Sequence, residues 1–137
     1  MLRWVVIKII IFWYSYGFVD NMEINLKLLV LRCANIDKAK QFYQVLGFNF
    51  VKEKHGKGVE HYAAENNGFV LELYPLALNQ SPDTSRLGFI VDDIFTLSKK
   101  LKAYSEISIV HNIKESQRGV MMLIQDPDGR KIEISSY

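Results

Sequence analysis

The stretch that decides the fold is GVEHYAAENNGFVLEL, residues 58–73, because the chain repeats its pattern as GVMMLIQDPDGRKIEI at residues 119–134. The two stretches align without a gap, so that Gly68 meets Gly129 and Glu72 meets Glu133. In each stretch a strand-like run leads into a turn closed by glycine, and a second strand-like run follows. Each stretch is therefore predicted to be a β-hairpin.

A strand followed by a helix is predicted upstream of each hairpin. The strands are expected at residues 26–32 and 87–91, and the helices at residues 36–46 and 93–104. Apolar side chains recur at three- and four-residue steps in both helices, as they do on the buried side of an amphipathic helix. The first helix has Asn35 as N-cap and Gly47 as its stop. The inward-facing residues of the second helix are expected to be Ile94, Leu97, Leu101 and Tyr104.

The order strand, helix, strand, strand, strand therefore occurs twice, and the predicted fold class is α+β. Two βαβββ modules, at about residues 24–75 and 84–136, are expected to form a curved mixed sheet. One helix on the outer face of each module leaves the other face free to curve around a cavity, so that the modules resemble two half-barrels. The whole domain is expected to span residues 22–137.

Residues 1–21 form an apolar N-terminal extension that differs from the rest of the chain. Fifteen of these 21 residues are apolar or aromatic, and they include both tryptophans. Lys8 interrupts the apolar run, which is also shorter than the roughly 20 residues of a membrane-spanning helix. Lys8 likewise splits the core of a secretory signal, and no small-x-small cleavage site precedes Asp20. A membrane association is therefore disfavoured. The preferred interpretation is an upstream extension before a natural start at Met22, and its β-branched residues are compatible with an added strand.

The composition narrows the class of protein. With 49% hydrophobic and 23% charged residues, the chain is typical of one globular domain. Its net charge of +2 is too small for a surface that neutralises many phosphates, so a nucleic acid partner is not expected. The single cysteine, Cys33, excludes an internal disulfide and fits a reducing compartment, which favours a cytoplasmic location. Cys33 aligns with Val91 in the repeat and is predicted to be a small buried hydrophobic residue rather than a nucleophile.

Two motifs resemble a known family. Residues 35–48, NIDKAKQFYQVLGF, resemble the D-x-x-x-S-x-x-F-Y-x-x-L-G-F helix of the vicinal oxygen chelate superfamily. Residues 126–134, DPDGRKIEI, resemble its D-P-D-G-x-x-I-E-L ending. That superfamily includes glyoxalase I, bleomycin resistance proteins, fosfomycin resistance enzymes and extradiol dioxygenases. The resemblance covers about residues 24–136 and implies the architecture rather than the reaction.

The resemblance also implies where a metal would be held. Catalytic members place one ligand on the first, fourth, fifth and eighth strands, and these positions correspond to Leu28, Glu72, Arg86 and Glu133. Leucine has no donor atom, and a guanidinium offers only N–H groups, so two of the four positions cannot bind a cation. No metal cofactor is therefore expected. Arg86 is predicted to neutralise the two carboxylates by bridging them, unless one of the glutamates points to solvent and Arg86 lies on the rim.

Three further residues are candidates for the ligand-binding site: His61, Tyr74 and Arg118. His61 shares a strand face with the small Ala63, which leaves room for a ligand. His61 is either a half-buried strand histidine or a general base, and with Glu72 it is the candidate catalytic residue. Tyr74 lies two residues beyond Glu72, and Arg118 precedes the seventh strand. His55 is expected to be an exposed loop residue.

Two functions of different classes remain. The first is a metal-free protein, similar to the bleomycin resistance branch, that binds a small, partly aromatic molecule in the cavity. The alternative is a lyase, isomerase or dioxygenase in which Glu72, Glu133 and His61 hold Zn, Ni, Mn or Fe and a substrate with vicinal oxygens. A metal-free enzyme with His61 or Glu72 as base is a third option. Relatives of this size commonly pair, so a homodimer is expected, with or without exchange of modules.

Overall fold

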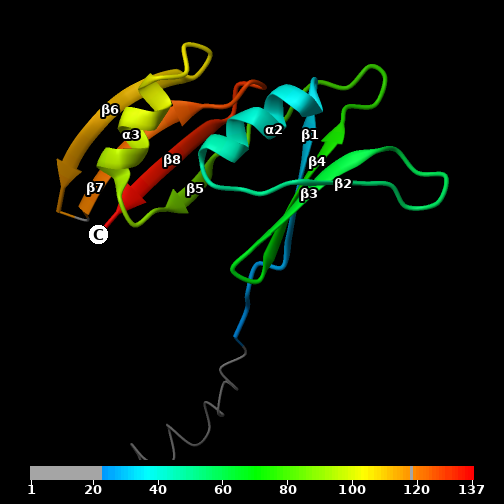
Figure 1. Cartoon of the computed structure of the whole chain (residues 1–137), viewed down its shortest axis with the longest axis horizontal. Helices are drawn as coiled ribbons and strands as arrows, with labels where there is room; N and C mark the ends of the chain where they lie inside the picture. The colour runs from blue at the N-terminus through cyan, green and yellow to red at the C-terminus, as the bar shows by residue number, and fades with distance from the viewer. Residues whose placement is uncertain (1–22, 118) are drawn as a thin grey trace, which may run out of the picture.

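The computed structural model describes residues 23–117 and 119–137, so the predictions for residues 1–21 and for Arg118 lie outside the described residues. In the described part, each half of the chain runs strand, helix, strand, strand, strand, as the repeat predicts (Figure 1). The elements are β1 (Leu28–Cys33), α2 (Ile36–Val45), β2 (Val51–Glu53), β3 (His61–Asn66), β4 (Phe69–Pro75), β5 (Leu87–Ile90), α3 (Ile94–Lys102), β6 (Ser108–Ser116), β7 (Gly119–Gln125) and β8 (Lys131–Ser136).

The strands form two mixed four-stranded sheets. The first sheet has the order β1-β4-β3-β2 and the second sheet the order β5-β8-β7-β6. In each sheet the edge strand β1 or β5 pairs in parallel with its neighbour, and the other pairs are antiparallel. The two sheets are not closed into one barrel, and α2 lies between them in Figure 1. The predicted α+β class with two half-barrel modules is confirmed.

The first helix begins and ends as its sequence predicts. The side chain of Asn35 accepts a hydrogen bond of 3.0 Å from the backbone N–H of Lys38, which satisfies an otherwise unpaired donor of the first turn. Gly47 follows the helix with a φ of +110°, a conformation that glycine adopts without steric penalty. Ala39, Phe42 and Tyr43 are buried on the inner side of α2, and they form one continuous core with apolar residues of both sheets.

The inward orientation predicted for Tyr104 is wrong. The side chain of Tyr104 is 50% exposed. The helix α3 ends at Lys102 and Ala103 is its C-cap, so Tyr104 lies in the turn beyond the helix. The helical periodicity that places Ile94, Leu97 and Leu101 in the core therefore does not extend to this residue.

A buried arginine joins the two halves of the chain. Arg130 is fully buried, and its guanidinium forms ion pairs with Asp126 at 3.1 Å, Asp128 at 3.3 Å and Asp83 at 2.7 Å. It also donates a hydrogen bond to the backbone carbonyl of Arg32, at the end of β1. The hydroxyl of Tyr43 on α2 donates to Asp126 at 2.8 Å, which ties the helix to the same network. The motif at residues 126–130 therefore holds the first half of the chain against the second half.

The network makes stability depend on pH through Asp83. Hydrogen bonds from Arg130 hold the pKa of Asp83 well below its usual range. Because the folded pKa is the lower one, the unfolded chain takes up this proton first as the pH falls. The contribution of Asp83 is complete above about pH 5 and declines below it. We expect Asp83→Asn to lower the free energy of unfolding at neutral pH and to weaken its decline between about pH 5 and about pH 2.

Urea unfolding at a series of pH values measures both effects of the Asp83 substitution. The matched control is Asp92→Asn, because Asp92 is exposed and forms no ion pair with a described residue. The control variant is expected to keep the pH dependence of the unsubstituted protein. Equal pH dependence in the two variants would show that Asp83 does not couple protonation to folding.

Candidate ligand-binding site

Each sheet has one face packed on a helix and one face that the helices leave uncovered. On β4, Leu71 and Leu73 are buried against the core, whereas Glu72 and Tyr74 point to the other side and are half-buried. We call the face that carries Glu72 and Tyr74 the open face of the first sheet. The corresponding side of the second sheet, which carries Glu133 on β8, is its open face. The predicted site residues that the structure describes lie on these two faces or beside them.

A row of four polar and aromatic side chains crosses the open face of the first sheet. Strand register places Arg32 beside Tyr74 and His61 beside Glu53, so the row runs across all four strands. The guanidinium carbon of Arg32 lies 4.8 Å from the ring centre of Tyr74. The rings of Tyr74 and His61 stack at 4.1 Å with an angle of 11°. The Nε2 atom of His61 lies 3.7 Å from a carboxylate oxygen of Glu53 and 3.3 Å from the hydroxyl of Tyr74.

The next row along the same face is apolar except for Glu72. Glu72 is registered between Val30 on β1 and Ala63 on β3, and Val51 on β2 completes the row. Val30 and Val51 are exposed, and so is Leu28 in the row beyond. Glu72 forms no ion pair with any residue that the structure describes. The open face of the first sheet therefore presents an uncompensated carboxylate within an apolar surface.

The open face of the second sheet holds an ion pair. Arg86, just before β5, donates a hydrogen bond of 2.9 Å from Nη2 to a carboxylate oxygen of Glu133. Both side chains are partly exposed, so water screens their attraction. The second predicted contact of Arg86, to Glu72, is absent within one chain. The structure thus brings Arg86 and Glu133 together and leaves Glu72 on the other sheet.

These residues do not fit the cation that the resemblance implies. Leu28 offers no ligand atom, and the guanidinium of Arg86 already occupies a carboxylate oxygen of Glu133. The charge next to Glu133 in this structure is therefore the guanidinium of Arg86. We derive no chemical step through a metal at these positions.

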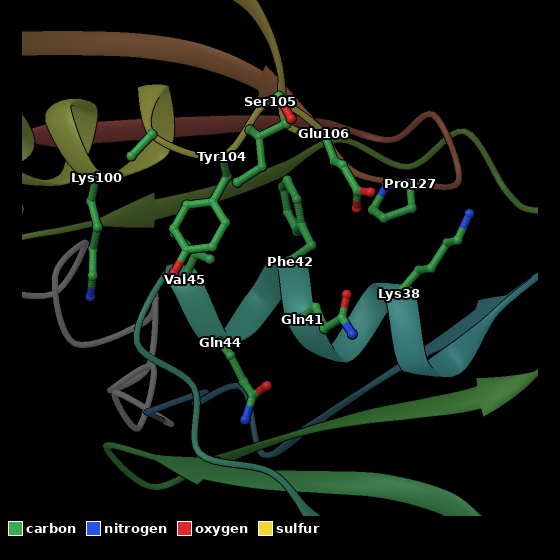
Figure 2. A pocket seen from close by; sticks show the side chains of 12 residues that line it. Lys38, Gln41, Phe42, Gln44, Val45, Lys100, Tyr104, Ser105, Glu106 and Pro127 are labelled. Carbon is green, nitrogen blue, oxygen red and sulfur yellow. The ribbon is translucent and has the colours of Figure 1, made fainter.

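The pocket drawn in Figure 2 lies elsewhere, on the helix side of the sheets. It is an open pocket of about 850 Å³ between α2 and the segment that follows α3. In Figure 2, Phe42 and Val45 come from α2, and Tyr104 points toward them from the other wall. None of the predicted site residues that the structure describes lines this pocket. It is separate from the cavity that the two half-barrels were predicted to enclose.

Two residues of the first open face were missing from the predicted site. Glu53 ends the short strand β2, and Arg32 lies on the edge strand β1. The spacing of Glu53, His55 and His61 around a glycine-containing turn was a usable signal for the first of them. Arg32 had no such signal, because its contact with Tyr74 depends on the parallel pairing of β1 with β4.

Cys33 is buried as predicted. Its side chain is inaccessible to solvent, and burial raises the pKa of the thiol to about 12. The thiolate that would act as a nucleophile is therefore scarce at neutral pH.

Comparison with known proteins now identifies the family. The family model of the glyoxalase-like domain matches residues 26–137, which is most of the chain. The chain belongs to the glyoxalase-like domain family. The predicted membership of the vicinal oxygen chelate superfamily is thereby confirmed. The helices of this glyoxalase-like domain have ten and nine residues, and the described part of the chain contains no helix that could span a membrane.

Several proteins are similar to this glyoxalase-like chain over most of its length. Glyoxalase domain-containing protein RDO1 of Mycosarcoma maydis is 27% identical over 120 residues, covering 82% of this chain and 68% of that protein. Integron cassette protein VCH_CASS1 from the mobile metagenome of V. cholerae is 28% identical, with a TM-score of 0.64 over 85% of this chain and 98% of the other. TnmS3, an antibiotic binding protein from Streptomyces sp. CB03234, is 21% identical and shares the fold with a TM-score of 0.68, over 84% and 97% of the two chains.

Proposed function

We propose that this glyoxalase-like protein binds a small, partly aromatic molecule on its open faces, without a metal at the family's metal positions. The observation that carries the proposal is the 2.9 Å ion pair between Arg86 and Glu133. The guanidinium of Arg86 supplies a positive charge where a catalytic relative needs a cation. Leu28 offers no ligand atom either, so only two of the four family positions could bind a metal. The fold itself can hold an antibiotic, as the name of TnmS3 states for that protein.

The residues of the first open face suggest which chemical groups such a molecule carries. Leu28, Val30 and Val51 offer apolar surface, and transfer of an aromatic ring from water onto such surface is favourable. Glu72 is the charged group in this surface, and a buried carboxylate needs a donor or a positive charge beside it. We infer a ligand with an aromatic body and an amine or hydroxyl group directed at Glu72.

We further propose that two copies of the chain complete the site. Among the described residues, the edge strands β1 and β5 each pair on one side only, which leaves backbone donors and acceptors available for another strand. The same residues leave both open faces uncovered by a helix, and they give Glu72 no cationic partner. If the first sheet of one copy faces the second sheet of another, Arg86 of the partner subunit supplies that charge.

We also propose that the protein is located in the cytoplasm. The free, buried thiol of Cys33 agrees with this reducing compartment.

The proposed pairing predicts the mass in solution. We expect a dimer at micromolar concentration, because a monomer would leave both the apolar open face and two strand edges in water. Light scattering after gel filtration measures this mass. A mass of one chain across the micromolar range would contradict the two-copy site.

The binding proposal predicts the effect of substitutions at the two charged positions. We expect calorimetric titration with a panel of phenols, aromatic amines and bleomycin to identify at least one compound that binds saturably. Glu72→Gln and Arg86→Met each remove a charge-assisted hydrogen bond and should weaken that ligand by about tenfold or more.

The control for the binding experiment is Glu106→Gln. Glu106 lines the pocket of Figure 2 and not the open faces, so this variant should bind as well as the unsubstituted protein. Weaker binding in the Glu106 variant alone would indicate that the ligand binds in the pocket beside α2 and not on the open faces. Unchanged binding in all three variants would contradict the proposed site.

A further inference from the structure

Three potential metal ligands converge at one end of the first open face. Glu53 ends β2, His55 follows in the turn, and His61 begins β3. One ligand atom from each residue lies within 4.8 Å of the other two. The carboxylate oxygen of Glu53 is 3.4 Å from Nε2 of His55 and 3.7 Å from Nε2 of His61. Two imidazoles and one carboxylate are a typical ligand set of zinc and of non-haem iron.

The distances suit a single ion placed between the three side chains. Ligand atoms bound tetrahedrally to zinc at its usual bond lengths are about 3.3 Å apart. The distances from the Glu53 carboxylate to the two histidines, 3.4 and 3.7 Å, are close to that value. The remaining distance, between the ligand atoms of the two histidines, is within 4.8 Å and closes if the side chains of Glu53 and His55 move, and both are exposed enough to do so.

The buried histidine is already oriented as a ligand. His61 is only 1% exposed, and its Nδ1 atom lies 3.2 Å from the backbone carbonyl of Val59. A carbonyl only accepts hydrogen bonds, so Nδ1 carries the proton and Nε2 of the neutral ring keeps its lone pair. Metal-binding histidines commonly donate their second ring N–H to a backbone carbonyl in this way. The ring of Tyr74, stacked at 4.1 Å, fixes the plane of the imidazole and therefore the direction of the lone pair.

The turn that carries His55 is also shaped to place it beside Glu53. The backbone N–H of Gly58 donates to the carbonyl of His55 at 2.9 Å and closes the turn. A Cβ atom at Gly58 would lie 2.9 Å from that oxygen, so a larger residue would displace the turn. The rings of His55 and His61 lie 5.3 Å apart between their centres. The turn thus brings the exposed histidine next to the buried one.

We propose that Glu53, His55 and His61 bind one divalent transition metal ion, with zinc as the reference metal. This site shares no residue with Leu28, Glu72, Arg86 and Glu133, the positions that the superfamily uses for its metal. An ion held by three protein ligands keeps coordination positions for water or for an oxygen or nitrogen atom of a bound molecule. Because His61 faces the same open surface as Glu72 and Tyr74, these positions are available to a ligand on that surface.

The test uses the untagged full-length protein and the metals alone. After removal of metal with a chelator and dialysis, the protein is titrated with Co²⁺ and the visible absorption of the bound ion is recorded. Zn²⁺ then displaces the Co²⁺, and the zinc content is measured by mass spectrometry. We expect one ion per chain. Glu53→Gln and His55→Ala should each weaken Co²⁺ binding by about 100-fold, because each removes a direct ligand.

The variants are chosen so that folding does not obscure the result. His61 is buried, and its replacement can unfold the protein, whereas Glu53 and His55 lie at the surface. The control is His111→Ala, because His111 is exposed and lies on β6, outside the cluster. It should bind Co²⁺ like the unsubstituted protein.

Two results would overturn the metal proposal. One is the absence of bound ion in the unsubstituted protein. The other is an ion that survives both Glu53→Gln and His55→Ala. If Glu72→Gln abolishes the ion instead, the metal is at the family's positions and the arginine proposal fails as well. Loss of metal binding with intact binding of an aromatic ligand would leave the proposed function standing, so the two failures are distinguishable.

Discussion

Arg130→Met is expected to lower the free energy of unfolding by about 3–5 kcal/mol. The substitution keeps most of the side-chain volume and removes the guanidinium. The carboxylate of Asp126, which is also fully buried, would then lack its ion pair, and a buried carboxylate without a positive partner is strongly unfavourable. Asp83 and Asp128 would lose their ion pairs with Arg130 at the same time. Urea unfolding followed by circular dichroism measures the change.

Lys102→Met is the matched control for Arg130→Met. It removes one positive charge from an exposed position at the end of α3, so the free energy of unfolding should stay within about 0.5 kcal/mol of its original value. A loss of less than about 1 kcal/mol in the Arg130 variant would show that the network contributes little to the contact between the two halves.

The second large effect is a gain of metal binding. Leu28→His together with Arg86→His would restore two imidazoles to the family's metal positions, beside Glu72 and Glu133. We expect this double variant to hold close to one Ni²⁺ or Zn²⁺ ion per chain at these positions, where the present residues offer only two carboxylates as ligands. The physical reason is that the substitutions replace an aliphatic side chain and a guanidinium by two imidazoles, and each imidazole offers a nitrogen lone pair to the ion.

Metal analysis after dialysis measures the gain. The experiment is made in a Glu53→Gln background, so that an ion at the cluster of Glu53, His55 and His61 does not contribute. The single variant Leu28→His, which retains Arg86, is the control and should remain without an ion at these positions. An equal metal content in the control and the double variant would show that Arg86 does not take the place of a cation.

The repeat predicted most of the fold because its signals are local. Turn residues such as Gly68 and Gly129, the cap at Asn35 and the stop at Gly47 act over a few residues, and the structure has them where they were predicted. Tyr104 was placed wrongly because apolar periodicity does not mark the last turn of a helix.

The candidate site was harder to predict from the sequence because its contacts depend on how the strands pair. Glu53 meets His61 through the register of β2 with β3, and this register cannot be derived from either strand alone. The ion pair of Arg130 with Asp83 links residues 47 positions apart, and Asp83 lies in the stretch without regular structure between β4 and β5. The pairing of Arg86 with Glu133 could be predicted from the sequence. The repeat related Glu133 to Glu72, and the family resemblance supplied the position of Arg86.

A crystal structure of the dimer with attention to Arg86 tests the central claim most directly. We expect its guanidinium within 4 Å of Glu133 of its own chain and of Glu72 of the partner subunit, with no ion between the carboxylates. Electron density for a metal ion bound by Glu72 and Glu133, with the guanidinium turned away from both, would contradict the claim.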